Sequence, residues 1–175
     1  MADPLTRKQC IIQNQTTCKF VVKANPKASS AEPIYEFSSF SEVNRHSSLI
    51  DQASKDLKVD AKLIRAIMYM ETTHGYYDAP LSLFGKNKSI LPMNVNVDYW
   101  GNTFGSREDL EKPAANITAG ATILRRIIDN LPPGASIAEI ATLYNNINAG
   151  TINDYGARVA EIYKKQPWVK ADTKK

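Results

Sequence analysis

The chain has 175 residues and a mass of 19.4 kDa, which is the size of one ordinary globular domain. Hydrophobic residues make up 43% of it and charged residues 23%, and this balance excludes a disordered or fibrous chain. Every apolar run is shorter than the roughly 20 residues that a membrane-spanning helix needs. We therefore expect no membrane insertion.

The formal charge of the chain is +4, and part of the excess lies in a lysine-rich stretch at residues 169–175, which we interpret as a basic tail. Such a tail is either simply solvated or attracted to a polyanion, for example nucleic acid or a cell-wall polymer. The sequence has no zinc-finger spacing, RRM signature or arginine-rich helix. We therefore expect no nucleic-acid partner.

Residues 1–37 differ in pattern from the rest of the chain and are interpreted as an extension followed by a linker. Cys10 and Cys18 flank a β-prone stretch that predicts a short β-hairpin, and a segment with two prolines and small polar residues follows it. The two cysteines form a disulfide if the protein works outside the cytosol and stay as thiols otherwise, and the sequence leaves both open. With 2 histidines in the chain, we expect no structural zinc site and no other cofactor.

Residues 38–168 show mainly helical periodicity and are expected to form one domain. The predicted capping residues are Asp60 and Asn116, and capping boxes are predicted at residues 39–42 and 136–139. The prolines and glycine at residues 132–134 end the helix that Asn116 begins. The apolar stripes that predict these helices are Val43, Ile50 and Leu57; Leu63, Ile67 and Met70; Ile123, Leu124 and Ile127; and Tyr155, Val159 and Ile162.

The helical periodicity is lost between residues 72 and 113, where glycines and prolines recur. A connection of this length inside a small domain is usually functional. Its aromatic residues, including Tyr99 and Trp100, have no regular spacing, and we expect some of them to line a groove. We therefore predict a long irregular active-site loop on one face of a helical domain.

Glu71 is the most informative single residue. On a helix it continues the apolar stripe of Leu63 and Ile67, and burial of its carboxyl group would raise its pKa towards neutrality, as a general acid requires. The alternative is a helix-terminal glutamate paired with a neighbouring cation. The spacing of Glu71 and His74 also fits half of a carboxylate-bridged di-iron site, but such a site needs a second copy of the motif, which the chain lacks.

Five short motifs in the region of residues 41–165 resemble, in order, those of one enzyme superfamily. Residues 59–71 resemble the helix that presents the catalytic glutamate in lytic transglycosylases and goose-type lysozymes. Thr72 stands where that family has a serine, and Asn94 stands where it has a glutamine. The other matching segments are Ser82-Leu83-Phe84-Gly85 with Pro92-Met93-Asn94-Val95, Asn116-Ile117 with Gly120, Leu143-Tyr144-Asn145, and Tyr155-Gly156-Ala157-Arg158-Val159.

This resemblance implies a mainly α, lysozyme-like (α+β) catalytic domain that cleaves the β-1,4 bond between N-acetylmuramic acid and N-acetylglucosamine. Glu71 would protonate the glycosidic oxygen. A lytic outcome needs no second carboxylate, whereas inverting hydrolysis does, and we prefer Asp98 to Asp78 for that role. Trp100 would stack on a sugar ring, so that its replacement weakens glycan binding with little change in melting temperature. The expected substrate-binding residues are Ser82, Asn94, Trp100, Tyr144, Asn145 and Tyr155.

The resemblance also bears on the cellular context of the protein. The resemblance and the lack of a signal peptide in the first residues favour a muramidase exported by another route, such as an antibacterial effector of the type VI secretion apparatus. It would act in the periplasm of a target bacterium, with peptidoglycan glycan strands as its substrate and a periplasmic immunity protein as a partner. The alternatives are a phage-associated lysin and a module that binds peptidoglycan or a partner protein without cleaving it.

Overall fold

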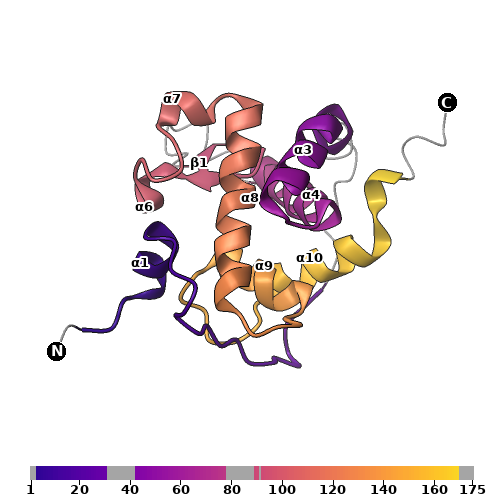
Figure 1. Ribbon diagram of the computed structural model, residues 1–175. Helices are drawn as coiled ribbons and strands as arrows, with labels where there is room; N and C mark the ends of the chain where they lie inside the picture. The colour runs from indigo at the N-terminus through magenta and orange to yellow at the C-terminus, as the bar shows by residue number, and fades with distance from the viewer. Residues whose placement is uncertain (1–2, 31–41, 78–88, 91, 170–175) are drawn as a thin grey trace.

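The computed structural model describes residues 3–30, 42–77, 89–90 and 92–169, and this part of the chain is mainly helical, as the sequence predicted (Figure 1). The only regular sheet there is an antiparallel pair in which Ser89 faces Asn96. None of the described helices is both long and apolar enough to cross a membrane. The elements are α1 (Arg7–Ile12), α3 (Ser47–Leu57), α4 (Ala61–Tyr77), β1 (Ser89–Ile90), β2 (Val95–Asn96), α6 (Val97–Trp100), α7 (Arg107–Leu110), α8 (Pro113–Asn130), α9 (Ile137–Asn145) and α10 (Asp154–Lys165).

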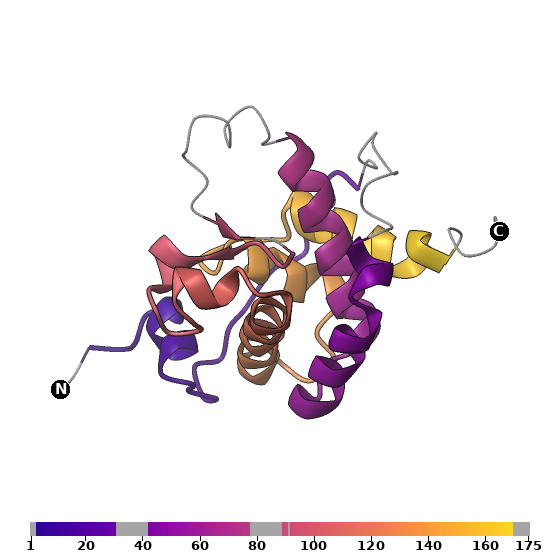
Figure 2. The same cartoon turned by 90° about the horizontal axis from the view of Figure 1, so that it is seen from above.

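Helix α8 occupies the centre of the molecule. The pair α3 and α4 lies on one side of it, and α1, α6, α7 and the strands lie on the other (Figures 1 and 2). Helix α10 packs against α9 and α4, which brings the C-terminal part of the fold up to the middle of α4. The predicted apolar stripes form the core: the innermost side chains include Leu63, Ile67, Met70, Ile117, Ile123 and Leu124.

Two of the predicted helix caps are confirmed and one is wrong. The carboxylate of Asp60 accepts a hydrogen bond from the Lys62 amide at 2.8 Å, and Ser136 Oγ accepts one from the Glu139 amide. In the predicted box at residues 136–139 the Glu139 carboxylate accepts from the Ser136 hydroxyl at 3.1 Å, where a reciprocal box would use the Ser136 amide. Asn116, however, is fully buried inside α8, which begins three residues earlier at Pro113. Proline suits the first helical position because its missing N–H would be unpaired there anyway. The predicted box at residues 39–42 lies mostly outside the described residues.

The N-terminal β-hairpin is also a wrong prediction, because residues 7–12 form helix α1. The Thr6 side chain accepts from the Gln9 amide while the Gln9 side chain accepts from the Thr6 amide, and this reciprocal pair begins the helix. Cys10 and Cys18 form a disulfide, the outcome expected for an oxidising compartment. Cys10 and the nearby Ile11 are buried in the same core as the helices of the main domain.

The segment from residue 72 to residue 113 is more regular than predicted. Helix α4 continues to Tyr77, and the segment also contains β1, β2, α6 and α7. Side-chain caps begin these short helices, since Asn96 accepts from the Tyr99 amide and Ser106 forms a reciprocal box with Asp109. Short elements of this kind give no periodic apolar signal, so glycine and proline dominated the sequence pattern. Residues 78–88 and 91 lie outside the described residues.

Candidate active site

A cavity of about 230 Å³ opens beside the C-terminal half of α4. Its described lining comes from α4, from β2 and α6, from α8, and from α9 with the turn that follows it. Segments far apart in the sequence therefore meet around one space. The described lining residues are Glu71, Asn94, Val95, Asn96, Tyr99, Trp100, Ile123, Tyr144, Asn145, Asn146, Ile147 and Asn148.

Glu71 presents a buried carboxyl group to this cavity. Its side chain is only 4% exposed, and both of its oxygens accept hydrogen bonds. The hydroxyl of Tyr155 on α10 donates to Oε1 at 2.5 Å, and the side-chain amide of Asn94 donates to Oε2 at 2.7 Å. The carboxyl group is thus held in one orientation from two sides, and both hydrogen bonds stabilise a negative charge on it.

Asn94 reaches Glu71 because the backbone around Met93 is fixed at both of its polar groups. The Met93 amide donates to the buried Asn116 side chain at 2.8 Å, and the Met93 carbonyl accepts from the Tyr144 hydroxyl at 2.7 Å. Asn94 then adopts φ 56°, in the left-handed region that asparagine tolerates better than most residues. The missing side chain of Gly120 leaves room for Met93, since a Cβ there would lie 2.7 Å from Met93 Cβ.

Two tyrosines beside Glu71 stay protonated over a wide pH range. Burial and the negative charge of Glu71 raise the pKa of Tyr144 well above its ordinary value. The same two causes, together with Tyr144 and the hydrogen bond to Glu71, raise the pKa of Tyr155 well above 10. Both phenols therefore act as hydrogen-bond donors at neutral pH and do not act as bases.

Apart from Glu71, the described lining is uncharged and combines side-chain amides and aromatic rings with the aliphatic residues Val95, Ile123 and Ile147. Side-chain amides project from β2 and from the turn after α9, and the Asn145 side chain is oriented by a hydrogen bond from Asn153 at 3.0 Å. Trp100 meets Tyr99 edge to face, with ring centroids 4.7 Å apart. Trp100 is only 9% exposed and belongs to the core, which contradicts the expectation that its loss would leave the melting temperature unchanged.

The structure brings most of the predicted site residues together. Glu71, Asn94, Trp100, Tyr144 and Asn145 line the cavity, and Tyr155 contacts the Glu71 carboxyl group directly. These residues come from four helices and from the turn between β1 and β2. The described parts of the predicted motifs that contribute these residues therefore meet in one place.

Two predicted residues are not part of the described lining of the cavity, for different reasons. Asp98 does not belong to its described lining; its side chain is 51% exposed and lies 3.7 Å from the Arg107 guanidinium. Ser82, like the alternative carboxylate Asp78, lies outside the described residues. The structure adds Asn146, Ile147 and Asn148, which the prediction missed; the signal available was the run of asparagines that follows the Tyr144-Asn145 motif.

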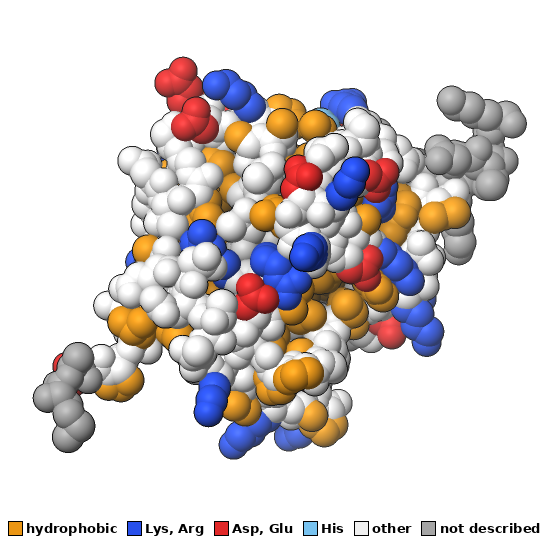
Figure 3. All heavy atoms as spheres, viewed as in Figure 1, with side chains coloured by type: hydrophobic (Ala, Val, Ile, Leu, Met, Phe, Trp, Pro, Cys, Tyr) orange, Lys and Arg blue, Asp and Glu red, His pale blue; other side chains and the backbone are white. Residues whose placement is uncertain are grey.

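The described residues contain no group of three or more histidine, cysteine or acidic side chains that could hold a metal ion. On the face shown in Figure 3, basic side chains are mixed with acidic ones and do not form a continuous stripe. Comparisons of the chain with protein-family models, with curated proteins and with solved structures found no match.

Proposed function

We propose that the protein is a muramidase with a lysozyme-like fold that cleaves the glycan strands of peptidoglycan, with Glu71 as its general acid. The observation that carries this proposal is the buried Glu71 carboxyl group, held by Asn94 and Tyr155 at the wall of a cavity. Uncharged amides and aromatic rings beside an acid suit a substrate made of N-acetylated sugars, whose faces are apolar and whose substituents are amides and hydroxyls.

In this mechanism Glu71 enters the reaction protonated and gives its proton to the glycosidic oxygen as an oxocarbenium-like transition state forms. A negative charge then develops on its carboxyl group. The Asn94 amide and the Tyr155 hydroxyl already point at the two oxygens, so they stabilise this charge without rearrangement. Tyr155 can keep donating because its raised pKa leaves the phenol protonated.

The second half of the reaction is proposed to be lytic. Glu71 is the only acidic residue in the described lining of the cavity. Inverting hydrolysis would need a second carboxylate roughly 6.5–9.5 Å from the first to hold a water molecule, and Asp98 lies outside that lining with its side chain beside Arg107. In the lytic route Glu71 itself takes a proton from the muramyl 6-hydroxyl group, which closes an anhydro ring.

The proposed place of action is outside the cytosol, in the periplasm of a target bacterium. The Cys10–Cys18 disulfide supports this, because disulfides persist in oxidising compartments and are rare in the cytosol. Delivery as a type VI secretion effector, together with an immunity protein that covers the cavity, is the form of this proposal that the motif resemblance favours. A phage-associated lysin would use the same chemistry.

The proposal is tested by the turnover of purified peptidoglycan sacculi. Glu71→Gln keeps the size of the side chain but removes the proton, and we expect activity to fall about 100-fold to 10,000-fold. Glu108→Gln is a matched control, because Glu108 is exposed on α7, and it should keep full activity. Mass spectrometry of the fragments then distinguishes anhydro ends from reducing ends. A wild-type protein that binds sacculi but releases no fragments would instead be a binding module.

A further inference from the structure

The N-terminal segment, residues 6–23, is attached to the wall of the cavity at two places. The Arg7 guanidinium on α1 donates to the carbonyl oxygens of Ile147 at 3.1 Å and Ala149 at 2.8 Å. Further along, the Lys23 amide donates to the Gly150 carbonyl at 2.9 Å, and the Lys23 carbonyl accepts from the Ile152 amide. We call residues 146–150 the cavity turn, because three of them line the cavity.

The cavity turn contains no helix or strand of its own. It lies between α9 and α10, and its internal hydrogen bonds are short-range: the Ala149 amide donates to the Asn146 carbonyl and the Asn148 amide to the Asn146 side chain. A guanidinium that donates to two carbonyls of one turn fixes the relative positions of those peptide groups. Arg7 therefore helps to set the direction in which Asn146 and Asn148 face the cavity.

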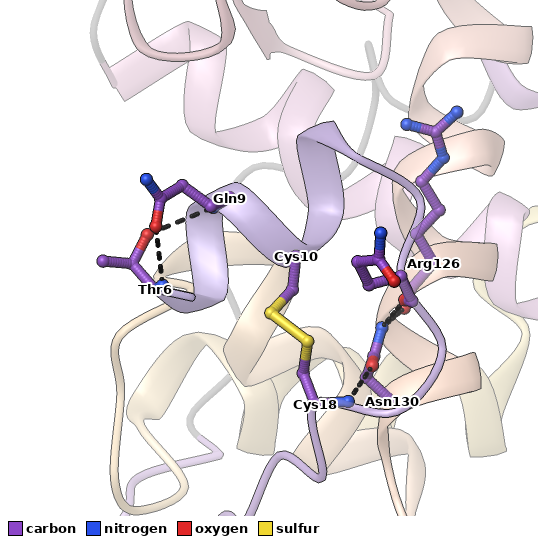
Figure 4. Close-up of a disulfide and its surroundings, with 7 residues drawn as sticks. Thr6, Gln9, Cys10, Cys18, Arg126 and Asn130 are labelled. Atoms are coloured by element: carbon purple, nitrogen blue, oxygen red, sulfur yellow. Dashed lines mark hydrogen bonds between the residues drawn. A yellow bond between two sulfur atoms is a disulfide. The ribbon is translucent and has the colours of Figure 1, made fainter. Parts of the chain in front are cut away.

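Arg7 is in turn held in place by contacts of the N-terminal segment. Its Nη2 donates to the Val21 carbonyl at 2.9 Å, which ties the start of the segment to its end. The Cys10–Cys18 disulfide closes the segment between these points, and the Asn130 side chain of α8 accepts from the Cys18 amide at 2.9 Å (Figure 4). The next residue of α1 also reaches the cavity wall: the Lys8 ammonium lies 4.5 Å from the centre of the Tyr99 ring, which lines the cavity.

We propose that Arg7 is a positioning residue of the substrate site, which acts through the cavity turn, and that the disulfide keeps Arg7 in register with that turn. The inference depends on the proposed function for its substrate, peptidoglycan glycan. Arg7 contacts the wall and makes no described contact with Glu71. Its loss should therefore weaken substrate binding and leave the chemical step unchanged, which distinguishes it from Asn94.

The test compares Arg7→Ala with Arg125→Ala in the full chain. Arg125 is a matched control, because its guanidinium also donates to a backbone carbonyl, that of Lys58 at 2.6 Å, but it does so away from the cavity. With soluble glycan strands as substrate, we expect Arg7→Ala to raise KM about tenfold, which is the scale of one lost hydrogen bond to a charged group, with kcat unchanged. Arg125→Ala should change neither constant.

A second measurement is independent of activity. Hydrogen exchange at the Ala149 and Asn148 amides should become about tenfold faster in Arg7→Ala, and Arg7→Lys, which keeps one cationic donor group, should recover part of the loss. Reduction of the disulfide should shift the same amides in the same direction. Unchanged exchange and unchanged KM in Arg7→Ala would overturn the inference. If exchange responds but the wild type cleaves no glycan, the muramidase proposal fails while the positioning of the turn is supported.

Discussion

Replacement of Trp100 by alanine should destabilise the fold, and the size of the effect follows from the burial of the ring. Trp100 is 9% exposed and contacts Tyr99 and Phe104 edge to face, with centroid distances of 4.7 and 5.6 Å. Truncation of a buried tryptophan to alanine costs about 3–5 kcal/mol of unfolding free energy. For a domain of this size each kcal/mol lowers the melting temperature by about 2–4 °C, so a fall of about 6–20 °C is expected.

Tyr99 provides the matched comparison, because it lines the same cavity but is only partly buried. Tyr99→Ala should lower the melting temperature much less than Trp100→Ala. If Tyr99 is the ring that stacks on sugar, its loss should also weaken the binding of soluble glycan strands. Thermal unfolding followed by circular dichroism, paired with calorimetric titration of glycan, measures both effects on the same samples.

Two separate results would contradict these expectations. A melting temperature for Trp100→Ala within about 2 °C of the wild type would show that the ring is not an element of the core. Unchanged glycan affinity in Tyr99→Ala would show that sugar does not stack there. The two results are independent of each other, because the two variants change different aromatic residues of the cavity wall.

Two further predictions concern α10. Gly156→Ala should lower the free energy of unfolding by about 1–3 kcal/mol or more, because a Cβ there would clash with Thr142 Oγ1. Gly150→Ala is the control, since a Cβ at Gly150 has nothing within 4 Å and the substitution should be neutral. Urea unfolding of the two variants measures the difference. The raised pKa of Tyr155 means that above pH 10 the unfolded chain loses a proton that the folded protein keeps, so stability should fall with rising pH there. Tyr155→Phe should flatten this dependence, and an unchanged slope would contradict it.

The sequence was most informative where a local period reports burial. The spacing of Leu63 and Ile67 placed Glu71 on the inner face of its helix, and the structure confirms that burial. Composition was misleading at the N-terminus, where β-branched residues suggested a strand although Thr6 and Gln9 have the spacing of a capping box. The reciprocal hydrogen bonds of that box determine the local backbone more strongly than the strand preference of neighbouring side chains.

Hydrogen bonds between residues far apart along the chain could not be predicted, because they leave no pattern in the sequence. Asparagine is a residue type typical of helix caps, but Asn116 lies inside α8. Its side-chain oxygen accepts a hydrogen bond from the Met93 amide, 23 residues away. Arg7 and Ile147 are 140 residues apart, and the sequence around neither residue predicts the contact. Such pairs form because buried polar groups must find partners, and the choice of partner is made by the tertiary fold.

The buried polar residues give the best indication of what this fold is organised around. Burying a polar side chain costs free energy unless its hydrogen bonds are satisfied, so such residues are poor devices for stability alone. In the described part of the chain, the hydrogen bonds of most of them lead towards the cavity, whereas the Thr72 hydroxyl donates within α4, to the carbonyls of Met68 and Tyr69. Asn116 holds Met93 and so aims Asn94, Asn130 holds the N-terminal segment that carries Arg7, and Thr142 holds Asn153, which orients Asn145. Among the residues that the structure describes, the fully or nearly buried polar ones are Glu71, Thr72, Asn116, Asn130 and Thr142. A fold that needed only a core could replace these side chains with apolar ones of similar size. A fold that must hold one carboxyl group and its wall in fixed geometry requires those whose hydrogen bonds lead to the cavity.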